Sequence, residues 1–72
     1  MYTVIEQQTN NGGTSVLTPV VKATRELAEQ EYFLKLSYAA VSKIEVHSVT
    51  LLNQEGKELM SRCYKHGSGA NV

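Results

Sequence analysis

The chain has 72 residues, the size of one small domain, and seven basic residues balance seven acidic ones. A net charge of zero indicates no basic face for nucleic acid and none for an anionic membrane surface. No window approaches the roughly 18 apolar residues of a membrane span. The N-terminus lacks a signal-peptide pattern, so we expect a cytoplasmic protein, in its own cell or in a host.

The first strand is predicted over residues 2–8, because β-branched and aromatic residues alternate with polar ones at its start. Asn11-Gly12 follows, and this pair is typical of a hairpin turn because both residues tolerate a positive φ. A second strand is predicted over residues 15–22. Pro19 lies inside it and cannot donate to a ladder, so this strand is an edge, is bulged, or ends near Thr18.

A helix is predicted from residue 25 to about residue 42, where helix-favouring residues run without glycine or proline. Thr24 is the expected N-cap, since its hydroxyl can accept a hydrogen bond from a free backbone N–H of the first turn. Glu31 and Lys35 are four residues apart in the order that favours an ion pair. The helix should therefore form the central element of the chain.

Two more strands are predicted over residues 44–53 and 57–65, and Asn53 and Gly56 at the first and fourth positions indicate a type I turn between them. The expected fold is α+β, in the order β-β-α-β-β: an antiparallel sheet of two hairpins with one helix packed on one face. Residues 1–66 form a single domain, and the tail of residues 67–72, without periodicity, is predicted to be disordered.

On a helical wheel, the helix shows two apolar sectors. We expect the narrower stripe to face the sheet, and it consists of Leu27, Leu34, Tyr38 and Val41. A second sector lies on the far side, and it consists of Ala28, Tyr32, Phe33, Leu36, Ala39 and Ala40. A helix that is apolar on both sides is expected to be buried on both sides.

The second hairpin also has two apolar faces. If Asn53 pairs with Gly56, Val46 faces Cys63 and Val49 faces Met60. One face then carries Ile44, Val46, Leu52, Leu59 and Cys63, and the other carries Val49, Leu51, Met60 and Tyr64. One helix covers one face, so apolar surface remains for a partner. The alternatives are a curled sheet that exposes some aliphatic side chains, and a bulge at Leu51-Leu52 that redistributes the faces.

Small domains commonly gain stability from disulfides, a metal or a partner subunit. Cys63 is the only cysteine, so no internal disulfide can form. Cys63, His66 and His47 offer one close-spaced pair and one further ligand, whereas structural zinc usually takes four. We therefore predict no metal and no cofactor, and interpret these residues as a buried thiol and two surface imidazoles. A partner subunit remains.

Catalytic arrangements are not indicated by the sequence. In the register above His47 opposes Arg62, and Cys63 points to the other face, so a thiol–imidazole pair does not form. A one-residue slip would bring Cys63 and His47 together. Asn11-Gly12-Gly13 lacks the spacing of a phosphate-binding loop and is read as a turn. We predict that the protein is not an enzyme.

Three segments together resemble a known class of proteins. They are Met1-Tyr2-Thr3-Val4-Ile5, the aromatic stretch of residues 31–39, and Val46 to Leu52 followed by Asn53 and Gly56. This pattern of residue types resembles short uncharacterised proteins encoded in bacterial prophage and phage-like gene clusters. The resemblance implies a small phage-derived accessory or virion protein, and it carries no catalytic residue across.

These observations predict a non-enzymatic assembly protein that binds itself, as a dimer or higher oligomer, or another protein, and that binds neither nucleic acid nor membrane. The alternative is a monomeric inhibitor or adaptor that binds a larger host protein. The predicted interface is the outer helix sector or the second sheet face, namely Tyr32, Phe33, Leu36, Ala39, Ala40, Val49, Leu51, Met60 and Tyr64.

Overall fold

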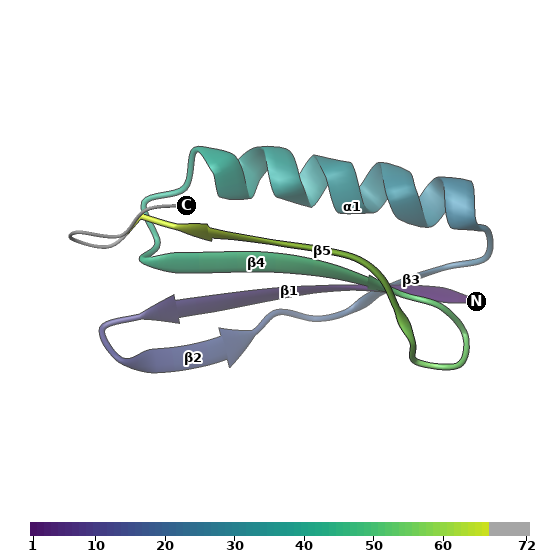
Figure 1. Ribbon diagram of the computed structural model, residues 1–72, viewed down its shortest axis with the longest axis horizontal. Coiled ribbons are helices and arrows are strands. Elements are labelled where there is room, and N and C mark those ends of the chain that lie inside the picture. The colour runs from purple at the N-terminus through teal and green to yellow at the C-terminus, as the bar shows by residue number, and fades with distance from the viewer. Residues whose placement is uncertain (67–72) are drawn as a thin grey trace.

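The computed structural model describes residues 1–66, and it has one helix packed on one face of an antiparallel sheet (Figure 1). The elements in chain order are β1 (Tyr2–Asn10), β2 (Gly13–Val16), β3 (Val20–Lys22), α1 (Arg25–Ala40), β4 (Val46–Leu52) and β5 (Glu58–Lys65). The strand order is β2-β1-β4-β5, with β3 also paired to β1. The predicted α+β class is confirmed. The tail prediction, for residues 67–72, falls outside the described residues.

The first hairpin turns at Asn11 and Gly12, which have φ angles of 54° and 80°. Two consecutive positive φ values match the twist of the flanking strands, which is why Asn-Gly is favoured there. The turn sets the register of β1 against β2, with Asn10 opposite Gly13. The predicted hairpin is therefore confirmed at the residues that indicated it.

Pro19 divides the predicted second strand into two pieces that both pair with β1. Gln7 lies opposite Val16 of β2, and Thr3 lies opposite Val21 of β3. Between the two pieces the backbone N–H of Leu17 donates to the carbonyl of Glu6 at 2.9 Å. Since proline cannot donate to the ladder, the chain crosses residues 17–19 outside regular pairing. This side of the sheet is thus a broken edge.

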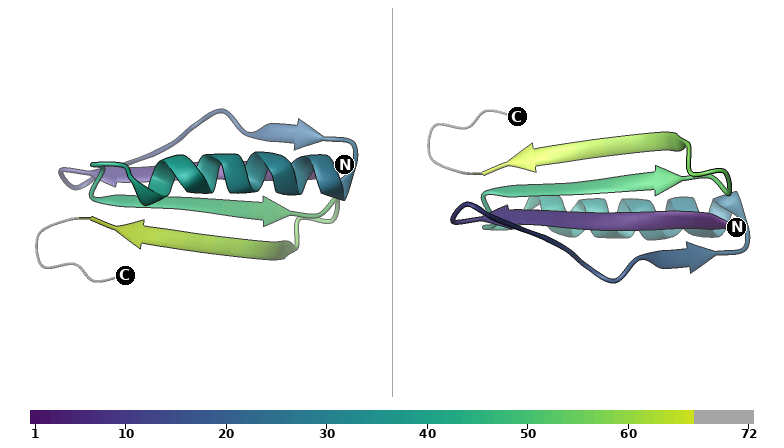
Figure 2. Two further views of the ribbon diagram at one scale, coloured as in Figure 1. Left: turned by 90° about the horizontal axis from the view of Figure 1, so that it is seen from above. Right: turned by 90° about the horizontal axis from the view of Figure 1, so that it is seen from below.

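The helix begins where the sequence predicted and ends two residues earlier. Thr24 has an extended backbone, and its Oγ1 accepts a hydrogen bond from the N–H of Leu27 at 3.2 Å. Arg25 and Glu29 form an exposed ion pair at 2.9 Å, one turn apart. Seen from above and below, α1 lies over β1 and β4 and leaves β5 to one side (Figure 2). The single helix of residues 1–66 is not long and apolar enough to cross a membrane.

The second hairpin has the predicted turn but a different register. The carbonyl of Asn53 accepts from the N–H of Gly56 at 3.0 Å, and its Oδ1 accepts from the N–H groups of Glu55 and Lys57. The ladder shifts at Leu51/Leu52, so Val46 faces Lys65 rather than Cys63, and Val49 faces Arg62 rather than Met60. The predicted pairing was wrong by two residues. An even shift leaves the residues on their predicted faces.

The core lies between α1 and the central strands β1 and β4. Its fully or almost fully buried side chains are Val4, Ala28, Tyr32, Ala39, Val49 and Leu51. Tyr2, Val20, Leu36, Leu59, Met60 and Tyr64 pack around this cluster. Cys63 lies on the uncovered face of the sheet and is exposed, so the predicted buried thiol was wrong. Leu59 was assigned to that uncovered face, but the ladder shift beside it turns it against the core.

Candidate functional site: the two faces of the helix and a buried polar cluster

The helix packs on the sheet with the sector opposite to the predicted one. Ala28 and Ala39 are completely buried and Tyr32 is 4% exposed, whereas Leu34 is 46% exposed and Val41 is 81% exposed. The predicted sheet-facing stripe was therefore wrong. The stripe had the larger side chains, but alanines let the helix axis approach the sheet closely while the ring of Tyr32 fills the remaining space.

The predicted interface residues fall into three groups. Tyr32, Ala39, Val49 and Leu51 are buried in the core, so the prediction that they form a free interface was wrong. Of the remaining five residues, three pack against the core and two do not. Leu36, Met60 and Tyr64 are half-buried, and Phe33 and Ala40 are exposed. The sheet face that carries Val49 and Leu51 was predicted to be free for a partner, because the sequence did not show that the helix packs on this face.

A polar cluster lies inside the layer between α1 and the two central strands. Glu6 of β1 and His47 of β4 are 8% and 3% exposed, and the Nε2 of His47 contacts Oε2 of Glu6. The Nζ of Lys35 on α1 lies 3.4 Å from Oε1 of Glu6 and 3.5 Å from Oε2 of Glu31. The cluster therefore joins α1 to β1 by an ion pair, and β1 to β4 by the contact between Glu6 and His47. The prediction that His47 is a surface imidazole was wrong.

This cluster has the residue types of an acid–base site but not the access of one. A general base must reach a proton on a substrate. His47 is almost completely buried, and residues 1–66 enclose no pocket. The Nδ1 of His47 is buried without a hydrogen-bond partner among the described residues. A charged network in this position contributes to the alignment of the packed elements, because breaking one contact leaves a buried charge unpaired.

Other candidate ligands and nucleophiles are kept apart. His47 lies under the helix opposite Tyr64, while Cys63 lies opposite Ser48 on the uncovered face. The Nε2–H of His66 donates to the carbonyl of Ala39, at 2.9 Å, beside the C-terminal end of α1. No group of three or more His, Cys, Asp or Glu side chains in residues 1–66 is placed to hold a metal ion.

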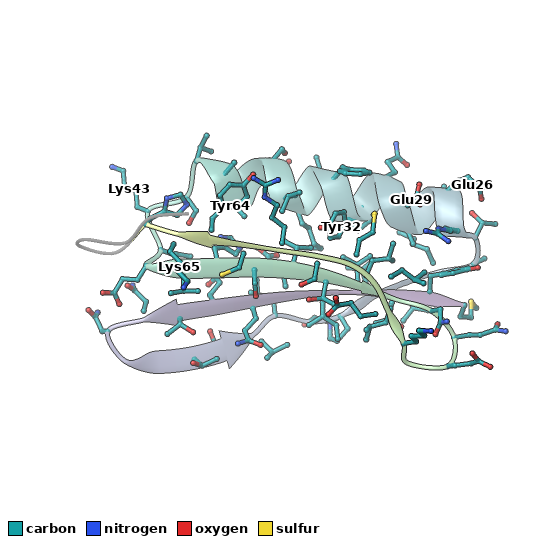
Figure 3. The ribbon with its side chains drawn as sticks, in the orientation of Figure 1. Glu26, Glu29, Tyr32, Lys43, Tyr64 and Lys65 are labelled. Carbon is teal, nitrogen blue, oxygen red and sulfur yellow. The ribbon has the colours of Figure 1, made fainter. Side chains whose placement is uncertain are left out.

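Tyr32 is the titratable group whose pKa departs most clearly from its ordinary value. Burial raises the pKa of the Tyr32 phenol above its ordinary value of 10.0, and the charge of Arg62 opposes this rise. The carboxylate of Glu58 and the phenol of Tyr64 add to it. These three residues are on β5, and Figure 3 shows Tyr32 between α1 and the sheet. The direction of the shift is the one expected of a phenol that is packed away from water.

The outward face of α1 carries a row of large apolar side chains, which we call the outer stripe. Their exposed fractions run from 46% to 81%. The outer stripe consists of Leu27, Leu34 and Tyr38 of α1 together with Val41, the C-cap of the helix. Three of its members recur at intervals of seven residues, which brings them to nearly the same side of a helix. Scattered exposed apolar residues are common, but several large ones aligned along one side of a helix are the feature expected of an interaction surface.

Charges at the two ends of the outer stripe have opposite sign. Glu26 lies in the first turn of α1, and Lys43 follows its last turn, as Figure 3 shows. Both side chains are exposed, and among the described residues neither takes part in an ion pair. The other charged residues of the helix pair within the molecule, Arg25 with Glu29 and Lys35 with Glu31 and Glu6. The stripe thus has an acidic end and a basic end.

Sequence reasoning missed the polar cluster because its parts are far apart along the chain. Glu6 and His47 are separated by 41 positions, and Glu6 occupies a strand position where alternation alone would place an apolar residue. The available signal was that Glu6 shares the face of Val4, a core residue.

Comparison of the chain with protein-family models, with curated proteins and with solved structures finds no match in any of the three.

Proposed function

We propose that the protein is a small non-enzymatic assembly protein whose copies associate through the outer stripe of α1. The single observation that carries this proposal is the row of four large apolar side chains, 46% to 81% exposed, on a helix whose other side is packed in the core. Removing such surface from water yields roughly 25 cal/mol per Å². A cytoplasmic location and an origin in phage-like genes belong to the same proposal, and they rest on the sequence pattern alone.

The occupant of the outer stripe is a second copy of the chain in an antiparallel arrangement. A two-fold axis beside Leu34 places Leu27 of one copy against Val41 of the other. The same axis brings Glu26 of each copy to the end of the partner helix where Lys43 lies (Figure 3). A parallel pair would instead place like charges together. Charge therefore favours the antiparallel arrangement.

The expected dimer is weak because the surface is narrow. A helix of 16 residues is about 24 Å long, and its pairing with one other helix buries less than the ~800 Å² per partner of a standard interface. We expect a dissociation constant in the micromolar range rather than an obligate dimer. The fold of the single chain, with its own buried core, is compatible with a monomer–dimer equilibrium.

The test is light scattering during size-exclusion chromatography over a hundredfold range of protein concentration. The mass of wild-type protein should rise above that of the monomer with increasing concentration, and the mass of Leu34→Glu should rise less, because this variant loses association through the outer stripe. The matched control is Val16→Glu on β2, which places the same charge at an apolar residue of similar exposure, 57% against 46%, away from the helix. Circular dichroism should be unchanged in both variants.

Two outcomes would contradict the proposal. A wild-type chain that remains monomeric throughout leaves the outer stripe for a different protein, and so favours the monomeric inhibitor or adaptor. Equal loss of association in Leu34→Glu and Val16→Glu removes the helix as the interface. In either case a pull-down with purified wild-type and Leu34→Glu protein would show whether the stripe serves another partner.

A further inference from the structure

The two edges of the sheet are built differently. On one side β2 has four residues, β3 has three, and Pro19 lies between them. Short strands and proline are the devices by which proteins prevent unwanted pairing at an edge. On the other side β5 runs for eight residues without proline, and β4 is its only strand neighbour among the described residues. The second edge therefore has neither a short strand nor a proline, although it carries the charged side chains of Arg62 and Lys65 and a ladder shift at one end.

The backbone groups that β5 presents at its edge follow from the hydrogen-bond pattern. The N–H of His66 donates to the carbonyl of Glu45 at 2.6 Å, so these two residues form a hydrogen-bonded pair. Such pairs alternate along an antiparallel ladder. Tyr64 and Arg62 therefore direct their N–H and C=O groups towards β4, and Ser61, Cys63 and Lys65 direct theirs away from the sheet.

The helix does not lie over this edge of the sheet. Figure 2 shows α1 set over β1 and β4, with β5 beside it rather than beneath it. β5 pairs with β4 in one continuous register from Met60 to Lys65. Before Met60, the ladder shift between Leu51 and Leu52 interrupts this register. His66 extends the run by one hydrogen-bonded residue. Seven residues, 60–66, are thus available to a new strand.

We propose that β5 pairs with β5 of a second copy, antiparallel and across a two-fold axis at Cys63, so that the two sheets become one. This register uses the whole run of residues 60–66, since Cys63 is its midpoint. It places Cys63 opposite Cys63, and Ser61 opposite Lys65. It also places Arg62 of each copy beside Tyr64 of the other, a contact that Arg62 already makes within its own strand at 5.2 Å from the ring centroid.

Two registers with the axis nearer the start of β5 are less favourable for specific reasons. The side chains of two paired residues in antiparallel strands point to the same face of the sheet. The two-fold axis can therefore pass at a residue of β5, but not between two residues. An axis at Arg62 places two guanidinium groups directly opposite each other, and like charges in that position are destabilising. An axis at Ser61 runs into the ladder shift beyond Met60 and shortens the pairing.

This interface is separate from the outer stripe, and the proposal does not depend on it. The outer stripe lies on the helix, and the β5 edge lies in the plane of the sheet. Two different self-complementary surfaces on one chain generate either a closed tetramer or an open chain of molecules. Variants that disable one surface should therefore leave dimers formed by the other.

Cys63 provides a direct test of the register. In the proposed pair the two Cys63 Cα atoms are about 5.5 Å apart, which is within the range that a disulfide spans. Diamide accepts the two electrons and two protons that the thiols lose. We expect wild-type protein treated with diamide to give a disulfide-linked dimer within minutes at micromolar concentration, and Leu34→Glu to give it at the same rate.

The matched control moves the thiol by two residues, in the double variant Cys63→Ser, Ser61→Cys. In the proposed register the two thiols at position 61 are four residues apart along the ladder, about 14 Å, so the disulfide should form at least tenfold more slowly. In the variant Cys63→Ser, Ser61→Cys, Lys65→Cys, intermolecular cross-linking should return. Ser61→Pro with Cys63 retained should also slow cross-linking, since the lost N–H points away from β4.

Equal cross-linking rates for thiols at positions 61 and 63 would mean random collision and would overturn the proposal. Absence of a wild-type disulfide dimer under diamide would overturn it as well. If Leu34→Glu abolishes the cross-link, the two surfaces are not independent, and the β5 edge does not pair by itself. Because the thiol variants change only exposed positions, their interpretation does not rest on a variant that fails to fold.

Discussion

The inner and outer faces of α1 both carry apolar residues, but the side chains on the two faces differ. The inner face meets the sheet with Ala28 and Ala39 beside a single large ring, Tyr32. The outer face carries Leu34 and Tyr38, 46% and 61% exposed. The comparison teaches that the size of the apolar residues does not show which side of a helix is buried. The buried side of the helix is the one whose side chains fit the distance between the helix and the sheet.

The largest expected effect comes from comparing a buried leucine of β4, which lies between sheet and helix, with an exposed leucine of the outer stripe. Leu51→Ala on β4 should lower the free energy of unfolding by about 2–5 kcal/mol, because Leu51 is fully buried and the truncation leaves a cavity. Leu34→Ala on the outer stripe should change it by less than about 0.5 kcal/mol. Urea unfolding, at protein concentrations below those of self-association, measures both. Equal losses would show that the outer stripe is buried in the single chain.

A smaller effect is expected when the alanines are enlarged. Ala28→Leu should cost about 1–3 kcal/mol, because the helix cannot keep its distance from the sheet with a larger residue there. Ala40→Leu, at an exposed position of the same helix, should cost almost nothing. Thermal unfolding followed by circular dichroism compares them. A stable Ala28→Leu variant would mean that the helix packs loosely, contrary to the complete burial of Ala28.

The smallest effect concerns the pH dependence of the inner face. Burial raises the pKa of Tyr32 in the folded chain above 10.0, so the folded state holds this proton more tightly than the unfolded state does. The resulting stability is fully present below pH 10.0 and is lost as the pH rises through the folded pKa. The free energy of unfolding should therefore fall more steeply above pH 10.0 in wild-type protein than in Tyr32→Phe. Parallel curves for the two proteins would contradict a packed Tyr32.

Much of the fold follows from local signals in the sequence. Asn11-Gly12 specifies its turn through two positive φ angles, Thr24 caps the helix, and Pro19 breaks the second strand. Each of these depends on residues a few positions apart, so a pattern along the chain is sufficient to find it. The α+β class and the single helix on one sheet face could be predicted for this reason.

The candidate surfaces required information that is not local. The helix face could not be assigned, because two apolar sectors competed and only the fit of Ala28 and Ala39 against the sheet distinguishes them. The hairpin register differed because the ladder shifts at Leu51/Leu52, a possibility that the sequence left open. The burial of His47 depends on Glu6, which is 41 positions away. Such contacts are made by the fold as a whole.

The position of β1 has a consequence for how the chain folds. β1 is the first strand in sequence, yet it lies inside the sheet, between the β2–β3 side and β4. Its first neighbours, β2 and β3, close through short connections, but β4 arrives only after the helix, with Val4 opposite Leu51. Pairings between distant residues form slowly because a long loop must close first. During synthesis one side of β1 is therefore exposed until β4 has emerged from the ribosome, and this interval is when the nascent chain is most exposed to aggregation.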